Sequence, residues 1–102
     1  MEESSAGAMI KLTSTNYTLW RTRMEDLLNC KDLFDPIEEN GVKPGEMADK
    51  AWSKMNKKTI GQIRNWIDHS VFHHVAQETD AYVLWKKLEN MFQAKTLRTR
   101  HF

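Results

Sequence analysis

Residues 47–67 read MADKAWSKMNKKTIGQIRNWI, which is the longest periodic run in the chain. The apolar residues of this run recur at steps of three or four, the pattern of one apolar face on a helix. Lysines and other polar residues fall between them, on the side that faces water. The spacing therefore predicts one helix about 30 Å long, in which Gly61 is the weakest position because glycine costs roughly 1 kcal/mol relative to alanine. The apolar face consists of Ala48, Ala51, Trp52, Met55, Ile63, Trp66 and Ile67.

The composition describes one small globular domain. Its 102 residues are 40% hydrophobic and 28% charged, with a net charge of +1, which is ordinary for a soluble protein. The basic residues are spread along the chain, so the basic excess of a dedicated nucleic-acid module is missing. No apolar run approaches the roughly 20 residues that cross a bilayer, and the first residues do not resemble a secretory signal. A single cysteine, Cys30, excludes an internal disulfide and fits a reducing compartment.

Three further helices are expected around the long one. Residues 13–16 are all good N-cap types, so a helix should begin there and end near residues 29–31. Asp68 or Ser70 should cap a short helix that carries Val71, Phe72 and Val75. Thr79 is the N-cap candidate of the last helix, with Asp80 near its positive end. The apolar stripes of the first and last helices are Tyr17, Trp20, Met24, Leu27 and Leu28, and Ala81, Leu84, Trp85, Leu88, Met91 and Phe92.

No window alternates as a strand does, so the predicted fold is all-α, a small domain of three main helices plus a short one. We expect residues 1–10 to form a disordered N-terminal arm. The short apolar segment from Met9 to Leu12 is expected to approach the core. Residues 11–95 should form the helical domain, and residues 96–102 a basic tail or the start of a further helix.

Several motifs occur in a distinctive order. Leu12 precedes Asn16-Tyr17-x-x-Trp20, and Met24 and Leu27 follow. Trp52 and Ile63 lie on the long helix, and Trp85, Leu88 and Phe92 on the last one. This order resembles the N-terminal capsid region of the Gag polyprotein of copia-type LTR retrotransposons over residues 11–92.

The resemblance implies a retroviral-capsid-like helical fold and a structural role. Gag subunits of this kind self-associate into cytoplasmic virus-like particles that package the RNA of the element, so the expected state is a homo-oligomer. The chain lacks a Cys-x-x-Cys-x-x-x-x-His-x-x-x-x-Cys zinc knuckle, so RNA contact is expected mainly through parts absent here. The resemblance implies that the matching residues form a family-signature core: Leu12, Asn16, Tyr17, Trp20, Met24, Leu27, Trp52, Ile63, Trp85, Leu88 and Phe92.

No catalytic, metal or cofactor site is predicted. The chain shows no nucleophile elbow, P-loop or paired-carboxylate pattern, so an enzyme with a small-molecule substrate is the least supported function. His69 and His73 have the i, i+4 spacing of two metal ligands, but no third ligand is evident, and surface histidines are the better interpretation. Cys30 follows Leu27 and Leu28, a position that favours core packing.

Two sets of residues are candidates for contact with other molecules. The apolar stripes of the long and last helices are wider than a three-helix core can cover. The residues left uncovered are predicted to form a self-association surface: Trp66, Ile67, Tyr82, Leu84 and Met91. The basic end of the chain is a weaker candidate for RNA contact: Lys95, Arg98 and Arg100. A basic flank on the long helix, Lys54, Lys57, Lys58 and Arg64, is interpreted as a solvated face.

Two functions remain as alternatives to the assembly of virus-like particles. The first is a domesticated Gag-derived adaptor that binds a host protein through its exposed apolar residues. The second is a weak RNA-binding module that uses the basic C-terminal end.

Overall fold

The computed structural model describes the backbone of residues 9–100 and the side chains of residues 9–92. Within this range it forms four α-helices and two short 3-10 turns and no β-strand, which confirms the all-α prediction. The elements follow one another in the order α2 (Tyr17–Cys30), η1 (Asp35–Ile37), η2 (Glu39–Gly41), α3 (Asp49–Asn65), α4 (His69–Phe72) and α5 (Ala81–Arg100).

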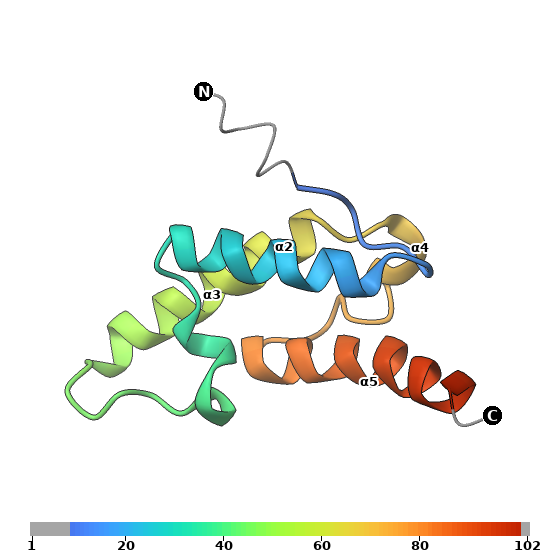
Figure 1. Cartoon of the computed structure of the whole chain (residues 1–102). Coiled ribbons are helices and arrows are strands. Elements are labelled where there is room, and N and C mark those ends of the chain that lie inside the picture. Colours follow the sequence, from blue (N-terminus) through green and yellow to red (C-terminus); the bar gives the residue numbers. More distant parts are fainter. Residues whose placement is uncertain (1–8, 101–102) are drawn as a thin grey trace.

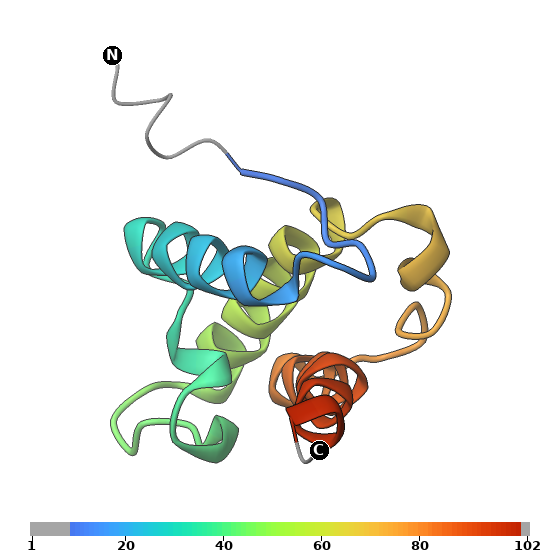
Figure 2. The same ribbon diagram turned by 45° about the vertical axis from the view of Figure 1, so that its right-hand side comes forward.

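The three long helices pack around one core. Figure 1 shows α2 and α5 running in opposite directions, with α3 crossing behind α2. Figure 2, in which α5 is seen nearly end-on, shows α2 and α5 on either side of the middle of the molecule. Apolar residues from all three helices are buried where they meet, because each helix turns its apolar stripe inward. The innermost of them, at 0% exposure, are Trp20, Met24, Leu28, Ile63, Ala81, Leu84 and Leu88.

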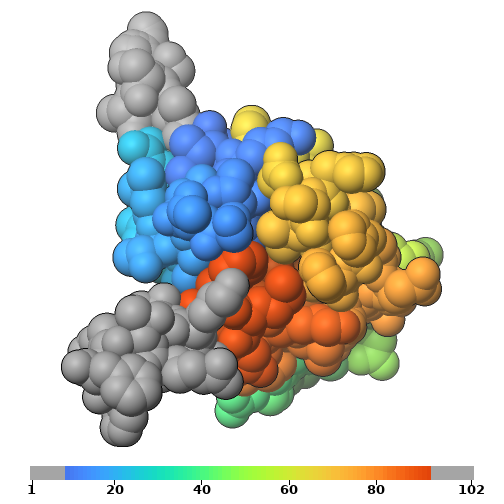
Figure 3. Space-filling model, turned by 90° about the vertical axis from the view of Figure 1, so that its right-hand side faces the viewer, coloured from blue at the N-terminus to red at the C-terminus, as the bar shows by residue number. Residues whose placement is uncertain are grey.

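The segment before α2 is tied to the segment after α3. The N–H of Leu12 donates to the carbonyl of Trp66 at 2.8 Å, and the N–H of Asp68 donates to the carbonyl of Leu12 at 2.9 Å. Leu12 and Ile67 thus form an isolated parallel bridge. Figure 3 shows the first described residues beside the segment that contains α4. Leu12 is 0% exposed, so the predicted approach of this arm to the core is confirmed.

Two helix starts differ from the sequence prediction. Asn16 precedes α2, but its side chain makes no capping bond. It instead accepts from the N–H of Thr13 at 2.8 Å and donates to the carbonyl of Lys11 at 2.9 Å, which fixes the turn into the helix. At α5 the prediction of Thr79 as the cap is wrong, because the carboxylate of Asp80 accepts from the N–H of Val83 at 3.1 Å.

The start of α5 also receives a cap from another helix. The Asn56 side chain on α3 accepts from the N–H of Ala81 at 2.8 Å and donates to the carbonyl of Thr79 at 2.9 Å. Arg64, two turns further along α3, donates to the carbonyl of Glu78. These bonds attach the start of α5 to α3. The start of α4 agrees with the prediction, since Asp68 accepts from the N–H of Ser70 at 3.1 Å.

The long helix and the last helix are both continuous. α3 passes through Gly61 without interruption. α5 extends to Arg100, so the backbone of residues 96–100 continues this helix. Residues 1–8 and 101–102, to which the predicted arm and tail extend, lie outside the described residues. Among the described helices, none combines the length and apolar character needed to cross a membrane.

Candidate functional site

Four aromatic residues of the predicted signature core join α2 to α5. The rings of Tyr17 and Phe92 stack with centroids 5.5 Å apart, and those of Trp20 and Trp85 lie 5.8 Å apart. The indole N–H of Trp20 donates to the carbonyl of Trp66 at 2.8 Å, so this buried polar group is satisfied. The aromatic motif therefore works as packing, and none of these rings is free to stack on a base.

Most other signature residues are in the core as well. Leu12, Met24, Ile63 and Leu88 are 0% exposed. Leu27 is half-buried and packs against the core.

Asn16 lies outside the core, in the turn before α2. Trp52 is the apolar exception, and the prediction that it belongs to the core is wrong. It is half-buried and does not belong to the core cluster or to the residues packed against it. The physical reason is that the first half of α3 extends beyond the ends of α2 and α5 (Figure 1). Ala48 and Ala51, which share its apolar stripe, are exposed. The sequence periodicity located the stripe but could not show where the covering helices end.

The predicted self-association surface is not a continuous patch. Ile67 and Leu84 are 4% and 0% exposed, so their assignment to a surface was wrong. Trp66 and Met91 are half-buried and pack against the core. Tyr82 is half-buried, and its hydroxyl donates to the Asn40 side chain at 3.0 Å. Leu12 pairs with Ile67, and Asn40 of η2 binds Tyr82, so segments outside the three long helices cover part of these stripes.

Large apolar residues outside the predicted self-association surface are the ones exposed to solvent. Leu19 on α2 is 51% exposed, Val83 on α5 is 46% exposed, and Val42 after η2 is 66% exposed. They lie on the polar side of their helices or in a loop, so helical periodicity gave no indication of them. Single exposed apolar residues are common on monomers, and these three are the large hydrophobic side chains exposed within residues 9–92.

A charged network crosses from α2 to α5. The Arg21 guanidinium contacts the Glu89 carboxylate at 3.1 Å and Glu25 at 3.4 Å, and the Lys86 ammonium contacts Glu89 at 2.6 Å. The hydrogen bond from Lys86, and then that from Arg21, hold the pKa of Glu89 below its usual value. Burial raises the pKa of the neighbouring Tyr17 hydroxyl to about 12, against the opposing charge of Arg21. This network is a structural clamp with the partners of each charge in place.

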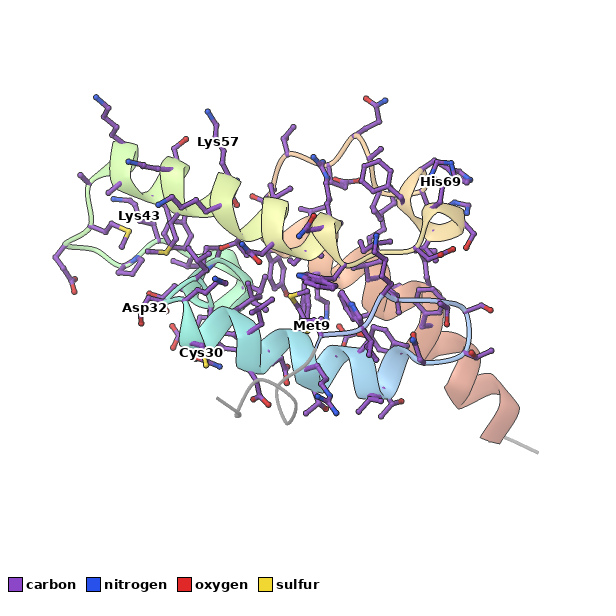
Figure 4. The ribbon with its side chains drawn as sticks, turned by 90° about the horizontal axis from the view of Figure 1, so that it is seen from above. Met9, Cys30, Asp32, Lys43, Lys57 and His69 are labelled. Atoms are coloured by element: carbon purple, nitrogen blue, oxygen red, sulfur yellow. The ribbon has the colours of Figure 1, made fainter. Side chains whose placement is uncertain are left out.

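The metal and cysteine candidates show no site. His69 and His73 are exposed, and within residues 9–92 no three metal-ligating side chains gather. Cys30 is exposed at the end of α2, so the core-packing interpretation of this residue was wrong. Figure 4 shows it on the outer edge of the molecule. The apolar stripe of α2 ends at Leu28, one half-turn before the cysteine.

The basic residues that the sequence singled out lie in two regions. Lys54, Lys57 and Lys58 are exposed on α3, while Arg64 is half-buried and bound to the Glu78 carbonyl. Lys95, Arg98 and Arg100 lie on the last turns of α5, where only the backbone is described. Their predicted contact with RNA stays a prediction.

The comparisons decide the family. A family model for the gag-polypeptide of LTR copia-type elements matches residues 24–102, most of the chain. The chain belongs to this family. The Gag domain is also 26% identical over 84 residues, 82% of its length, to the Retrovirus-related Pol polyprotein from transposon TNT 1-94 of Nicotiana tabacum, and it spans 6% of that polyprotein. No solved structure matches it.

Family membership confirms the resemblance that the sequence motifs indicated. The gag-polypeptide family is structural rather than catalytic.

Proposed function

We propose that this Gag domain self-associates, as a non-enzymatic building block of cytoplasmic virus-like particles that package the RNA of the element. Its mechanism is the burial of exposed side chains between identical subunits, with no cofactor or metal. A modest contact is sufficient, because each contact is repeated many times in a closed shell.

Membership in the copia-type gag family is the observation that carries this proposal. Two structural features support it. The aromatic and aliphatic core makes the domain a rigid unit, which preserves the orientation of its outer faces. Leu19 on α2, Val42 after η2 and Val83 on α5, together with the half-buried Trp52 on α3, supply apolar surface from four different segments of the chain. A shell subunit needs contacts on more than one side, whereas an adaptor for a single partner needs one.

Sedimentation velocity across a wide range of protein concentrations tests the proposal, with negative-stain electron microscopy of the concentrated sample. We expect a single species to shift to larger assemblies as concentration rises. Three single variants, Leu19→Ser, Val42→Ser and Val83→Ser, each remove one exposed apolar side chain. Weaker association in one or more of them locates the contacts. Thr18→Ser, an exposed substitution on α2, is the control that should leave association unchanged.

A chain that stays monomeric at every concentration contradicts the proposal. If that monomer is retained on immobilised polynucleotide in a salt-sensitive way, the RNA-binding function replaces it. If it is not retained, the adaptor function remains.

A further inference from the structure

Four lysines form one exposed face on α3. Lys50, Lys54, Lys57 and Lys58 are all exposed. At about 100° per residue they fall within about 100° of one another around the helix, in a row about 12 Å long. In Figure 4 the Lys57 side chain extends from α3 away from the other helices. We call these four residues the lysine face.

The lysine face has no acidic partner among the side chains that the structure describes. Lysines elsewhere do have one: Lys43 contacts Asp49 at 3.1 Å and Lys87 contacts Glu78 at 2.8 Å. Asp49, the acid closest in sequence to the lysine face, is therefore occupied by Lys43. Like charges at i, i+3 and i, i+4 destabilise a helix. A negatively charged surface laid against this face would remove that repulsion.

The same chain carries a hollow of opposite charge. Asp35, Glu38 and Glu39, around η1 and η2, line an open hollow of about 160 Å³ together with Val42 and Pro44. All three acids are exposed and have no cationic side chain against them in the described part of the chain. A cavity of about 150 Å³ holds a benzene molecule, so this hollow has room for the four-carbon stem of a lysine. Val42 and Pro44 can pack against such a stem while the acids receive its ammonium. We call these five residues the acidic hollow.

One copy cannot join these two surfaces itself. The Thr59 hydroxyl, on the inner side of α3, donates to the carbonyl of Leu33 at 2.7 Å, directly before η1. Lys50 lies nine residues from Thr59, which is about half a turn around the helix axis. The inner side of α3 therefore faces the segment that carries the hollow, and the lysine face points away from it. Contact between the two surfaces requires two molecules.

We propose that the lysine face of α3 docks into the acidic hollow of a second copy of this chain. The inference rests on the proposed self-association and specifies one of its contacts. Because two different surfaces meet, the contact is head-to-tail: it forms a ring if the rotation between copies closes and a filament if it does not. Opposite charges across the contact also fix the register of the two copies.

Charge reversal tests the proposal on the full chain. Lys54→Glu/Lys57→Glu reverses the lysine face, and Glu38→Lys/Glu39→Lys reverses the acidic hollow. Each double variant alone should associate at least tenfold more weakly than the wild type in sedimentation equilibrium. An equimolar mixture of the two should regain association, because each retains one native surface and the reversed pair is complementary again. Lys11→Glu/Lys31→Glu carries the same charge change on exposed lysines elsewhere and should associate as the wild type does. Circular dichroism confirms that each variant is folded.

The outcomes separate this inference from the proposed function. Wild-type association that neither double variant weakens overturns the docking contact and leaves self-association standing. Weakening that the mixture does not relieve overturns the docking contact too. So does a lysine-face variant that loses retention on polynucleotide but still associates normally, because the face then binds phosphates. A wild-type chain that never associates overturns the proposed function itself.

Discussion

Replacing Asn56 by alanine should destabilise the domain far more than its half-exposed position on α3 suggests. The Asn56 side chain supplies the acceptor for the N–H of Ala81, the first residue of α5, at 2.8 Å. Ala81 is 0% exposed, so water cannot replace a lost acceptor there. An unsatisfied buried N–H costs about 1–3 kcal/mol, and loss of a helix cap alone costs about 0.5–2 kcal/mol. We expect Asn56→Ala to lower the free energy of unfolding by about 2 kcal/mol.

Two further variants isolate this bond. Asn56→Asp keeps an oxygen acceptor at the positive end of α5 and loses only the donor to the exposed Thr79 carbonyl. It should therefore lose less than about 1 kcal/mol. Asn65→Ala makes the same chemical change at an exposed position of the same helix and should stay within about 0.5 kcal/mol of the wild type.

Urea unfolding followed by tryptophan fluorescence measures all three variants, because Trp20 and Trp85 are buried in the core. In a thermal melt, each kcal/mol should lower the midpoint by about 4–8 °C for a domain of this size. The reasoning is refuted if Asn56→Ala is as stable as Asn65→Ala. It is also refuted if Asn56→Asp loses as much as Asn56→Ala, since the acceptor would then not be what stabilises α5.

Three more predictions concern single positions. Gly61→Ala should raise the free energy of unfolding by about 1 kcal/mol, because an added Cβ meets nothing within 4 Å. Gly41→Ala should lower it by about 2 kcal/mol or more, because φ is +70° and the Cβ would lie 2.6 Å from that of Tyr82; thermal melts that show the same sign for both changes would contradict this contrast. Thr59→Val should cost about 1–3 kcal/mol in urea unfolding although the shape is kept, because the Leu33 carbonyl loses its donor; wild-type stability would mean that this carbonyl has another donor. Glu89 contributes stability above its unfolded-state pKa and loses it as pH falls through the lowered folded-state pKa. The stability gap between the wild type and Glu89→Gln should therefore be widest near pH 7 and should narrow as the pH falls below the ordinary glutamate pKa of about 4.3; a gap that does not change with pH would argue against the Lys86 and Arg21 contacts.

The family of the chain, its helices and most of its aromatic core could be predicted from the sequence. Trp20 and Trp85 recur on helical stripes, and the order of these motifs along the chain led to the gag family that the comparisons confirm. Both properties are local: the spacing of apolar residues along a helix fixes which face is buried, whatever that face is buried against. The surface was predicted poorly for the same reason. Ile67 and Leu84 were assigned to the outside, and Cys30 and Trp52 to the inside.

By itself, then, the sequence determined that this chain forms an all-α Gag domain with tryptophans of α2 and α5 at its centre. Only the tertiary structure decided that Asn56 caps the start of α5, that the arm at Leu12 covers Ile67, and that α3 extends past its neighbours and leaves Trp52 half-covered. The physical reason is that exposure and capping depend on where separate elements end and cross. That information lies in long-range contacts, and the periodicity of a single helix does not contain it.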